Sequence, residues 1–468
     1  MPELVLIILS YMSVSECAKL LSVNSIFFRA GAGFVWKELF DPAPLFAVLD
    51  KPLRQIDNDY RPLVISIPTR IARKRWQRFR IYADCMRKVT NFHPVFERRI
   101  EWSGLGHLRA RAPVALCVDT IEFLWHNYDA SEAWDFWKVI RLLLGPTTLT
   151  LRCYGSSVSR GLLVEHARHM LEYAQAVGSN LINLTQQTAS SENNKEIEAL
   201  VLQICACKQL TTLQLGSELV SGLVLNYLCS LPNLQQLTFS APPQSNKPSV
   251  CQSLEVDNIM AGLPFPSLQS LFLSYISCAA IGQLFFARPS LLNNITELYV
   301  HISNHFGFCN ISTESLTRLF VLVTEHGSQI EDLTVAWPSS VDPCEMSPAH
   351  LMCLFSLNLR RLTLHTVKLP NESLGVAHIA GRWPLLSHLI MPHQPVWPVD
   401  LLQLAERPAL QVLCVDVKRI STGNVKLTTG FETDASATPV QLESQFDIEG
   451  ASEDEVEEMA RSVLPTTK

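Results

Sequence analysis

The sequence is poor in charge and has no long apolar run. Only 18% of its 468 residues are charged, against a usual ~25%, and 47% are hydrophobic. This composition excludes a mostly disordered chain. The densest apolar stretch covers residues 4–9, far short of the ~18–20 residues of a membrane-spanning helix. No charged segment precedes that stretch, so we expect no signal peptide and no membrane partner.

The cysteines are not clustered. Thirteen are scattered from Cys17 to Cys414, no C-x-x-C motif occurs, and the closest pair is Cys205 and Cys207. A secreted disulfide framework or a zinc module would cluster its cysteines. We therefore expect reduced cysteines that pack as small core residues, in a protein of the cytoplasm or the nucleus.

Catalytic motifs are missing as well. The sequence contains no phosphate-binding G-x-x-x-x-G-K-[ST], no H-E-x-x-H and no G-x-S-x-G. Two histidine pairs, His166 with His169 and His301 with His305, could each hold a metal ion, but neither has a clear third ligand at short range. We expect ordinary surface or core histidines, and hence no metal, no cofactor and no enzymatic activity.

Charge is distributed unevenly along the chain. Residues 70–111 hold twelve Lys or Arg and three acidic residues, whereas residues 430–468 hold ten acidic and two basic residues. We expect residues 419–468 to form a disordered acidic tail. The basic stretch is typical either of a site for an anionic partner such as RNA or of a solvated helix face. Because Trp76 and Phe79 fit a core as well as base stacking, we favour the solvated face and expect no nucleic-acid partner.

The first forty residues predict three short helices. Residues 3–12 form a helix that is apolar nearly all round, so it must be buried nearly all round. Ser13 and Ser15 can cap the next helix, and Gly31 with Gly33 separates two further apolar clusters. Three short helices are too small to enclose this apolar surface themselves. The surplus must meet either the rest of the chain or a second protein.

Residues 1–45 resemble an F-box. The resemblance rests on three segments with the family's order and spacing, namely residues 2–12, Leu20-x-x-Val23-Asn24-x-x-Phe27 and residues 35–39. Residues 76–87 also resemble the segment that follows the F-box in many fungal F-box proteins. The resemblance implies docking on the Skp-family adaptor of an SCF-type cullin-RING ubiquitin ligase. Carried over by position, the family's apolar positions, which face the adaptor or the F-box core, are Pro2, Leu4, Ile8, Leu9, Leu20, Val23, Phe27, Trp36 and Leu39. Helices that simply pack on the following domain are the alternative.

A strand-like hexamer, apolar-x-x-Leu-x-apolar, recurs in the larger part of the chain. Eight full copies begin 24 to 35 residues apart, at Leu210, Leu234, Leu268, Ile295, Ile330, Leu359, Leu386 and Leu410, and a weaker copy begins at Leu181. Helix-like segments separate the copies. The period resembles the ~20–29 residues of leucine-rich repeats, although the Asn or Cys that follows in that family is missing. We expect a curved α/β solenoid over residues 151–418, after a linker and helical region over residues 46–150, and another α/β packing is the alternative.

Alternation along such strands exposes the residues beside each central Leu. This strip carries both signs of charge and aromatic rings, which are favoured anchors in protein interfaces. We expect it to hold a target protein through Phe272, Tyr299, Asp332, Arg361 and His388. The sequence thus predicts an α/β protein in which a three-helix F-box precedes a leucine-rich-repeat solenoid. Its predicted function is to present an unidentified target to the ligase, and the alternative is a leucine-rich-repeat scaffold that is not attached to a ubiquitin ligase.

Overall fold

The computed structural model describes the chain in segments that fold into two compact units. Unit 1 comprises Met1–Leu219, Ser230–Leu234 and Pro242–Ser245, and unit 2 comprises Val220–Cys229, Gln235–Ala241 and Asn246–Lys468. The described residues are 2–21, 23, 25–39, 43–49, 63–92, 100–103, 118–125, 141–155, 160–187, 194–216, 219–220, 222–240, 265–276, 278–302, 313–336, 344–346, 351–365, 367–369, 376–396, 401, 403–404, 407, 409–417 and 441–442.

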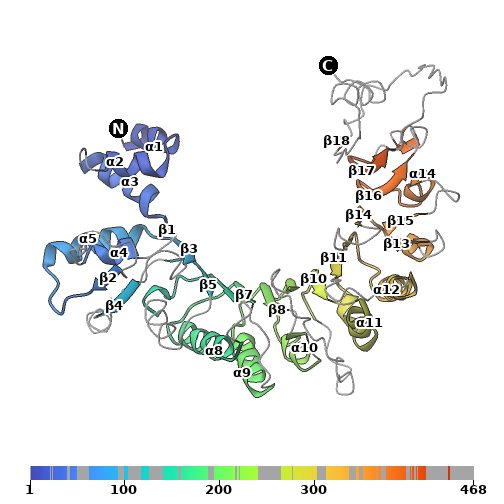
Figure 1. Ribbon diagram of the computed structural model, residues 1–468, viewed down its shortest axis with the longest axis horizontal. Helices are drawn as coiled ribbons and strands as arrows, with labels where there is room; N and C mark the ends of the chain where they lie inside the picture. Colours follow the sequence, from blue (N-terminus) through green and yellow to red (C-terminus); the bar gives the residue numbers. More distant parts are fainter. Residues whose placement is uncertain are drawn as a thin grey trace. The chain divides into compact units, whose positions relative to one another are not determined.

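Three helices open unit 1, α1 (Pro2–Ser10), α2 (Val14–Leu20) and α3 (Ser25–Trp36) (Figure 1). Ser13 caps α2 in a capping box. Its hydroxyl accepts a hydrogen bond from the Glu16 backbone N–H at 3.4 Å, and the Glu16 carboxylate accepts one from the Ser13 N–H at 2.9 Å. Hydrogen bonds from the Ser13 hydroxyl and backbone hold the pKa of Glu16 below its ordinary value. The sequence therefore predicted this helix start correctly.

Helix α3 runs through both glycines that were expected to separate two apolar clusters. Gly31 and Gly33 lie inside the helix, so the clusters on either side of them belong to one element. Gly31 is buried, and a Cβ atom there would lie 2.7 Å from Leu21 Cδ2 and 3.3 Å from Leu9 Cδ1. The absence of a side chain lets α3 approach α1 and the end of α2 closely.

Helix α3 packs on α5 (Arg73–Cys85). The Trp36 ring stacks on Tyr82 with the centroids 4.3 Å apart, and Phe28 contacts the same ring at 5.9 Å. Elsewhere on α5, Phe79 packs on Phe46 of α4 (Ala43–Ala47), also at 5.9 Å between centroids. These ring contacts join α3, α4 and α5 into one packed group of helices.

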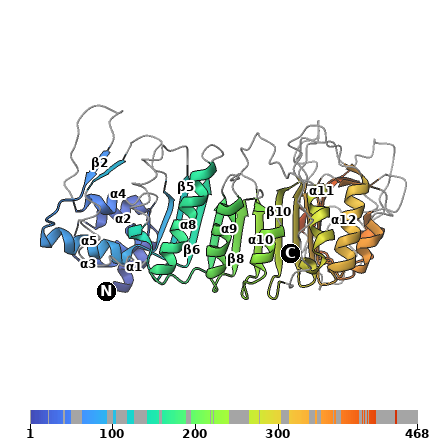
Figure 2. The same ribbon diagram turned by 90° about the horizontal axis from the view of Figure 1, so that it is seen from below.

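The strands of unit 1 form a parallel sheet in chain order, with α8 (Arg160–Ala176) and α9 (Asn194–Ala206) on one face (Figure 2). The strands are β1 (Glu38–Leu39), β3 (Lys88–Phe92), β5 (Thr120–Trp125), β6 (Thr150–Gly155), β7 (Asn183–Gln187) and β8 (Thr212–Gly216). Two other strands, β2 (Leu63–Ser66) and β4 (Ile100–Ser103), pair with each other in parallel.

This sheet begins well before residue 151, where the solenoid was expected to start. Strands β3, β5 and β6 pair in register through Val89, Ile121 and Leu151, which are all buried. Residues 46–150 therefore contribute strands of the same sheet, in addition to helices. The hexamer pattern is hard to see here because Val89 and Ile121 stand in place of the central Leu, and one first position is polar. That residue, Thr148, is buried and donates its hydroxyl to the Val118 carbonyl oxygen at 3.0 Å.

The strands of unit 2 are also parallel and follow chain order. They are β9 (Gln236–Ser240), β10 (Ser270–Ile276), β11 (Glu297–Ile302), β12 (Asp332–Ala336), β14 (Arg361–Leu364), β16 (His388–Val396), β17 (Val412–Val417) and β18 (Gln441–Leu442). The connections include α10 (Gly222–Leu228), α11 (Cys278–Ala287), η3 (Pro289–Leu292), α12 (Thr313–His326), η4 (Cys353–Ser356) and α14 (Val376–Ala380). Helices α11 and α12 lie on one face of the strands beside them (Figures 1 and 2). A separate pair is formed by β13 (Cys344–Glu345) and β15 (Val367–Lys368).

The hexamer pattern correctly predicted the apolar core. The first, central and last apolar residues of all eight full copies are buried, and so are Leu181 and Leu184 of the weaker copy. The central leucines also align between strands, since Leu298 pairs with Leu271 on one side and with Leu333 on the other. The predicted α/β class is confirmed as parallel strands connected by helices or 3-10 turns.

Two residues of the predicted acidic tail take part in the sheet. Strand β18 pairs in parallel with β17 through Gln441 and Leu442. The other residues of 419–468 lie outside the described part of the chain. Among the described residues, no helix combines the length and the apolar character needed to cross a bilayer.

Candidate protein-binding surfaces

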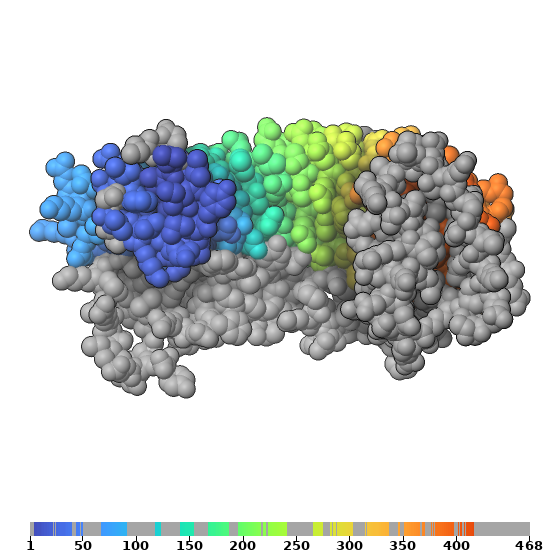
Figure 3. Space-filling model, turned by 90° about the horizontal axis from the view of Figure 1, so that it is seen from above, coloured from blue at the N-terminus to red at the C-terminus, as the bar shows by residue number. Residues whose placement is uncertain are grey.

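The first candidate surface consists of apolar side chains of the first three helices and their turns. Its exposed members, which we call the N-terminal apolar surface, are Leu4, Leu6, Ile7, Ile8, Tyr11, Val14, Val23, Ile26 and Phe34. Figure 3 shows these helices in dark blue, facing the viewer. Within the described residues of unit 1, helix α1 is therefore not buried all round.

The residues carried over from the F-box pattern divide into two groups. Leu4, Ile8 and Val23 lie on the N-terminal apolar surface, with exposed fractions of 59%, 51% and 63%. The remaining positions with described side chains are turned inward, with Leu9 buried and Leu20, Phe27, Trp36 and Leu39 half-buried. The side chain of Pro2 lies outside the described residues, although Pro2 itself begins α1. The structure thus separates surface positions from core positions, a division that the sequence alone does not show.

The N-terminal apolar surface has the chemistry of a protein-binding site. Contiguous exposed apolar patches of several hundred Å² normally mark interaction sites on soluble proteins. Burying one Leu or Ile side chain in an interface contributes about 1.5–3 kcal/mol. Because Gly31 and the Trp36–Tyr82 stack fix α3 against its neighbours, the surface is presented by packed helices.

The second candidate surface lies on the strands of unit 2, between the buried core positions. Two rows of side chains cross the strands, one on each side of the central Leu. The first row holds Gln236, Ser270, Glu297, Asp332, Arg361 and His388, and the second holds Thr238, Phe272, Tyr299, Thr334, Thr363 and Ile390. We call these two rows the unit 2 sheet face. All five residues predicted to bind a target belong to it.

The first row of the unit 2 sheet face carries both signs of charge on adjacent strands. Asp332 on β12 and Arg361 on β14 form an ion pair, and the hydrogen bond that Arg361 donates to the Asp332 carboxylate raises the pKa of Arg361. Glu297 on β11 accepts a hydrogen bond from the Ser270 hydroxyl at 3.0 Å. The carboxylates of Glu297 and Asp332 and the guanidinium of Arg361 therefore lie on three neighbouring strands. This row presents both signs of charge to a binding partner.

The second row places aromatic rings next to these charges. The rings of Phe272 and Tyr299 lie 5.8 Å apart, and the His301 ring meets Tyr299 edge-on at 6.5 Å. His388 stands in the first row, where its Nδ1 lies 2.8 Å from the Ser387 hydroxyl. The structure thus brings Phe272 together with Tyr299, and Asp332 together with Arg361, whereas His388 contacts a neighbour in sequence.

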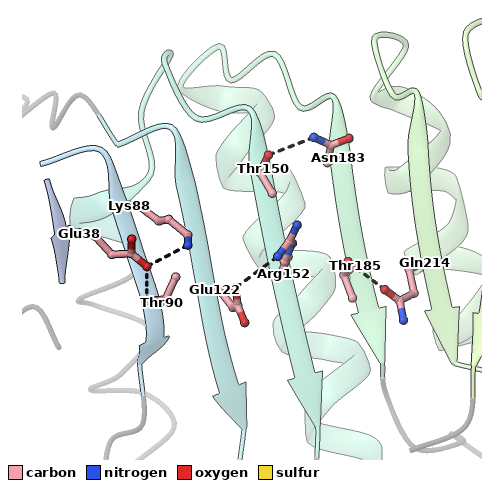
Figure 4. A network of polar contacts seen from close by, with 9 residues as sticks. All are labelled: Glu38, Lys88, Thr90, Glu122, Thr150, Arg152, Asn183, Thr185 and Gln214. Atoms are coloured by element: carbon pink, nitrogen blue, oxygen red, sulfur yellow. Dashed lines mark hydrogen bonds and ion pairs between the residues drawn. The ribbon is translucent and has the colours of Figure 1, made fainter. Parts of the chain in front are cut away.

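A polar network on the unit 1 strands was not predicted from the sequence (Figure 4). Its links join neighbouring strands: Lys88 Nζ to Glu38 at 2.8 Å, Thr90 to Glu38 at 3.2 Å, Arg152 to Glu122 at 3.4 Å, Asn183 to Thr150 at 3.2 Å and Thr185 to Gln214 at 3.4 Å. The hydrogen bond from Lys88 is the main reason why the pKa of Glu38 lies below its ordinary value. These side chains therefore pair with one another across neighbouring strands, as Asp332 and Arg361 do on the unit 2 sheet face.

The signal for these unit 1 positions is present in the sequence but weak. Val118, Ile121 and Phe123 keep the spacing of the hexamer, with Ile in place of the central Leu. Allowing β-branched residues at the central position would have extended the repeat pattern to β5 and would have found Glu122 beside it.

One member of each histidine pair considered as metal ligands lies outside the described part of the chain, His166 by its side chain and His305 altogether. Among the described residues, no cluster of three or more His, Cys, Asp or Glu side chains able to hold a metal ion occurs. His169 lies 3.1 Å from the carboxylate of Glu172 on the same helix.

Comparison with known proteins does not assign this chain to a family. No protein-family profile matches the sequence, and no curated protein is significantly similar to it.

Proposed function

We propose that this protein is the substrate-receptor subunit of an SCF-type cullin-RING ubiquitin ligase. Helices α1–α3 act as an F-box that docks on the Skp-family adaptor, and the unit 2 sheet face presents a target protein. The chain itself performs no catalysis. By holding target and ligase together in the cytoplasm or the nucleus, it raises their effective concentration.

The observation that carries this proposal is the exposure of α1. Leu4 and Ile8 match apolar positions of the F-box pattern and are more than half exposed, whereas Leu9 of the same helix is 1% exposed. Helix α1 has apolar residues on all sides, and the described residues of unit 1 cover only part of them, so the proposal supplies a partner for the remainder. The resemblance of residues 1–45 to an F-box favours a Skp-family adaptor as that partner.

The form of the strands supports a leucine-rich-repeat solenoid as the target-binding part. Each full hexamer buries its three apolar residues, and the strands run parallel in chain order. Such stacked strand–helix units offer extended surfaces for binding other proteins. The mixture of Asp332, Arg361 and the Phe272–Tyr299 pair suits a folded protein or a peptide better than a small apolar ligand.

Replacing two exposed residues of α1 tests the adaptor contact. We expect the full-length variant Leu4→Ser with Ile8→Ser to lose the Skp-family adaptor and the cullin in affinity purification, with a fall of at least tenfold. Both side chains are exposed, so the change removes apolar contact area without opening a cavity in the core.

The matched control carries Leu202→Ser and Leu223→Ser, two exposed leucines of α9 and α10. It should retain the adaptor at the wild-type level, and circular dichroism should show that both variants are folded. If the wild-type chain recovers neither adaptor nor cullin, the proposal is wrong, and a leucine-rich-repeat scaffold without a ligase becomes the better description.

A further inference from the structure

The exposed side of α5 carries cations that the proposed function does not use. Its members, which we call the α5 cationic face, are Arg73, Lys74, Arg78 and Arg80, and Arg70 just before the helix is exposed as well. In the described segments none of these side chains forms an ion pair. Arg75, by contrast, is half-buried, and its guanidinium donates to the Leu49 carbonyl oxygen at 3.4 Å.

This arrangement of charge opposes the stability of the helix. Three cations occupy the first turn, where the helix dipole favours acidic residues, and no acidic residue is present there. Ala72 at the N-cap makes no side-chain capping hydrogen bond. Lys74 and Arg78 are four residues apart, a spacing at which like charges repel. Local stability therefore gives no reason for Arg73, Lys74 and Arg78, whereas an anionic partner would; Arg80 has the exposed Asp84 four residues further along the helix, a favourable spacing.

The aromatic residues of α5 argue against single-stranded nucleic acid as that partner. Proteins that bind single strands stack the bases on exposed rings. Here Phe79 is buried, the Trp76 ring stacks on it at 5.4 Å, and Tyr82 stacks on Trp36. The exposed apolar side chain on α5 is that of Ile81, which is 46% exposed, is not aromatic and lies one turn from Arg78.

Two features favour a protein partner. Ile81 supplies an apolar contact among the cations, and α5 packs on α3, the helix that carries part of the N-terminal apolar surface. Protein interfaces combine an apolar centre with a polar rim, and arginine is enriched in them. Guanidinium groups also bind carboxylates in a bidentate geometry.

We propose that the α5 cationic face is a docking site for an acidic segment of a partner protein. The carboxylates of that segment pair with Arg73, Lys74, Arg78 and Arg80, and one of its apolar side chains covers Ile81. This site goes beyond the proposed function, because acidic segments would bind here whether or not the chain belongs to a ligase.

The test uses the full chain and a fluorescein-labelled twelve-residue peptide of alternating Glu and Gly, followed by fluorescence anisotropy at low salt. We expect the wild-type chain to bind this peptide, and the same peptide with Gln in place of Glu to bind at least tenfold more weakly. Raising the salt concentration should weaken binding of the Glu peptide, because the contacts are between exposed charges.

The deciding variant combines Arg73→Gln, Lys74→Gln and Arg78→Gln, and it should bind the Glu peptide at least tenfold more weakly. Its melting temperature should not fall, since like charges are removed from one helix. The control combines Lys208→Gln, Arg382→Gln and Arg407→Gln, three exposed cations outside α5, and should bind like the wild type.

Three outcomes would overturn the inference. The first is that the wild-type chain does not bind the Glu peptide, in which case the α5 cationic face is an ordinary solvated helix face. The second is equal binding by the deciding variant and the control. The third is tighter binding of a 20-nucleotide poly(U) RNA than of the Glu peptide. None of these results bears on adaptor recovery by the Leu4→Ser, Ile8→Ser variant, so this inference and the proposed function can fail separately.

Discussion

At the residue scale, Gly31 shows how one missing side chain sets the packing of the N-terminal helices. A Cβ atom at this position would come within 2.7 Å of Leu21 and 3.3 Å of Leu9, whereas one at Gly33 would meet no atom within 4 Å. We expect Gly31→Val to lower the free energy of unfolding by about 1–3 kcal/mol, because it overpacks this contact. Gly33→Val, in the same helix, should change it by only about 0.5 kcal/mol or less. Urea denaturation measures both, and equal effects of the two variants would contradict the packing argument.

Two half-buried histidines of unit 2 link its stability to pH. Burial, and then the neighbouring His365, lowers the pKa of His301 below its ordinary 6.5, and burial followed by His393 does the same to His365. The unfolded chain therefore binds more protons than the folded chain as the pH falls through 6.5. The stabilisation from these groups is complete above the unfolded pKa and is lost as the pH falls through the lower folded values.

We expect the midpoint of urea unfolding to fall between about pH 8 and pH 5, and this fall to be smaller in the double variant His301→Gln, His365→Gln. The exposed His378 of α14 provides the control, and His378→Gln should keep the wild-type dependence. A double variant with an unchanged pH dependence would show that other groups are responsible.

At the element scale, strands were easier to predict than surfaces. The hexamer spacing predicted the buried positions of β8–β12, β14, β16 and β17 because a strand's side-chain direction depends on spacing alone. It did not reach β3 and β5, whose core positions include Val89 and Ile121 in place of Leu. Asp332 and Arg361 occupy the same position in hexamer copies that lie 29 residues apart, but the pattern does not show that the two side chains pair across β12 and β14.

The N-terminal helices illustrate a different limit. An α1 that is apolar on all sides has the same sequence pattern whether its cover is the rest of the chain or another protein. The structure shows that Leu4 and Ile8 remain exposed, and that Trp36 packs on Tyr82. The sequence of α1 therefore predicts that another surface must cover its apolar side chains. Which of these side chains remain exposed becomes visible only from the packing of α1 on the neighbouring helices.

At the scale of the whole molecule, the two proposed activities belong to different compact units. The N-terminal apolar surface lies in unit 1, and Asp332 and Arg361 lie in unit 2. Because each unit has its own buried core, a surface change in one should leave the binding surface of the other intact. Adaptor recovery and target recovery should therefore be separable by substitution.

Exchanging the two charges of unit 2, as Asp332→Arg with Arg361→Asp, tests this separation. The exchange keeps opposite charges on adjacent strands, so the cross-strand attraction and the fold should persist. A target whose charges complement Asp332 and Arg361 in their native positions faces charges of the same sign in the exchanged variant. We therefore expect recovery of that target to fall at least tenfold. Quantitative mass spectrometry after affinity purification, with the proteasome inhibited, would show loss of target proteins and unchanged adaptor. The Leu4→Ser, Ile8→Ser variant should give the opposite pattern, and joint loss of adaptor and target in either variant would contradict two independent surfaces.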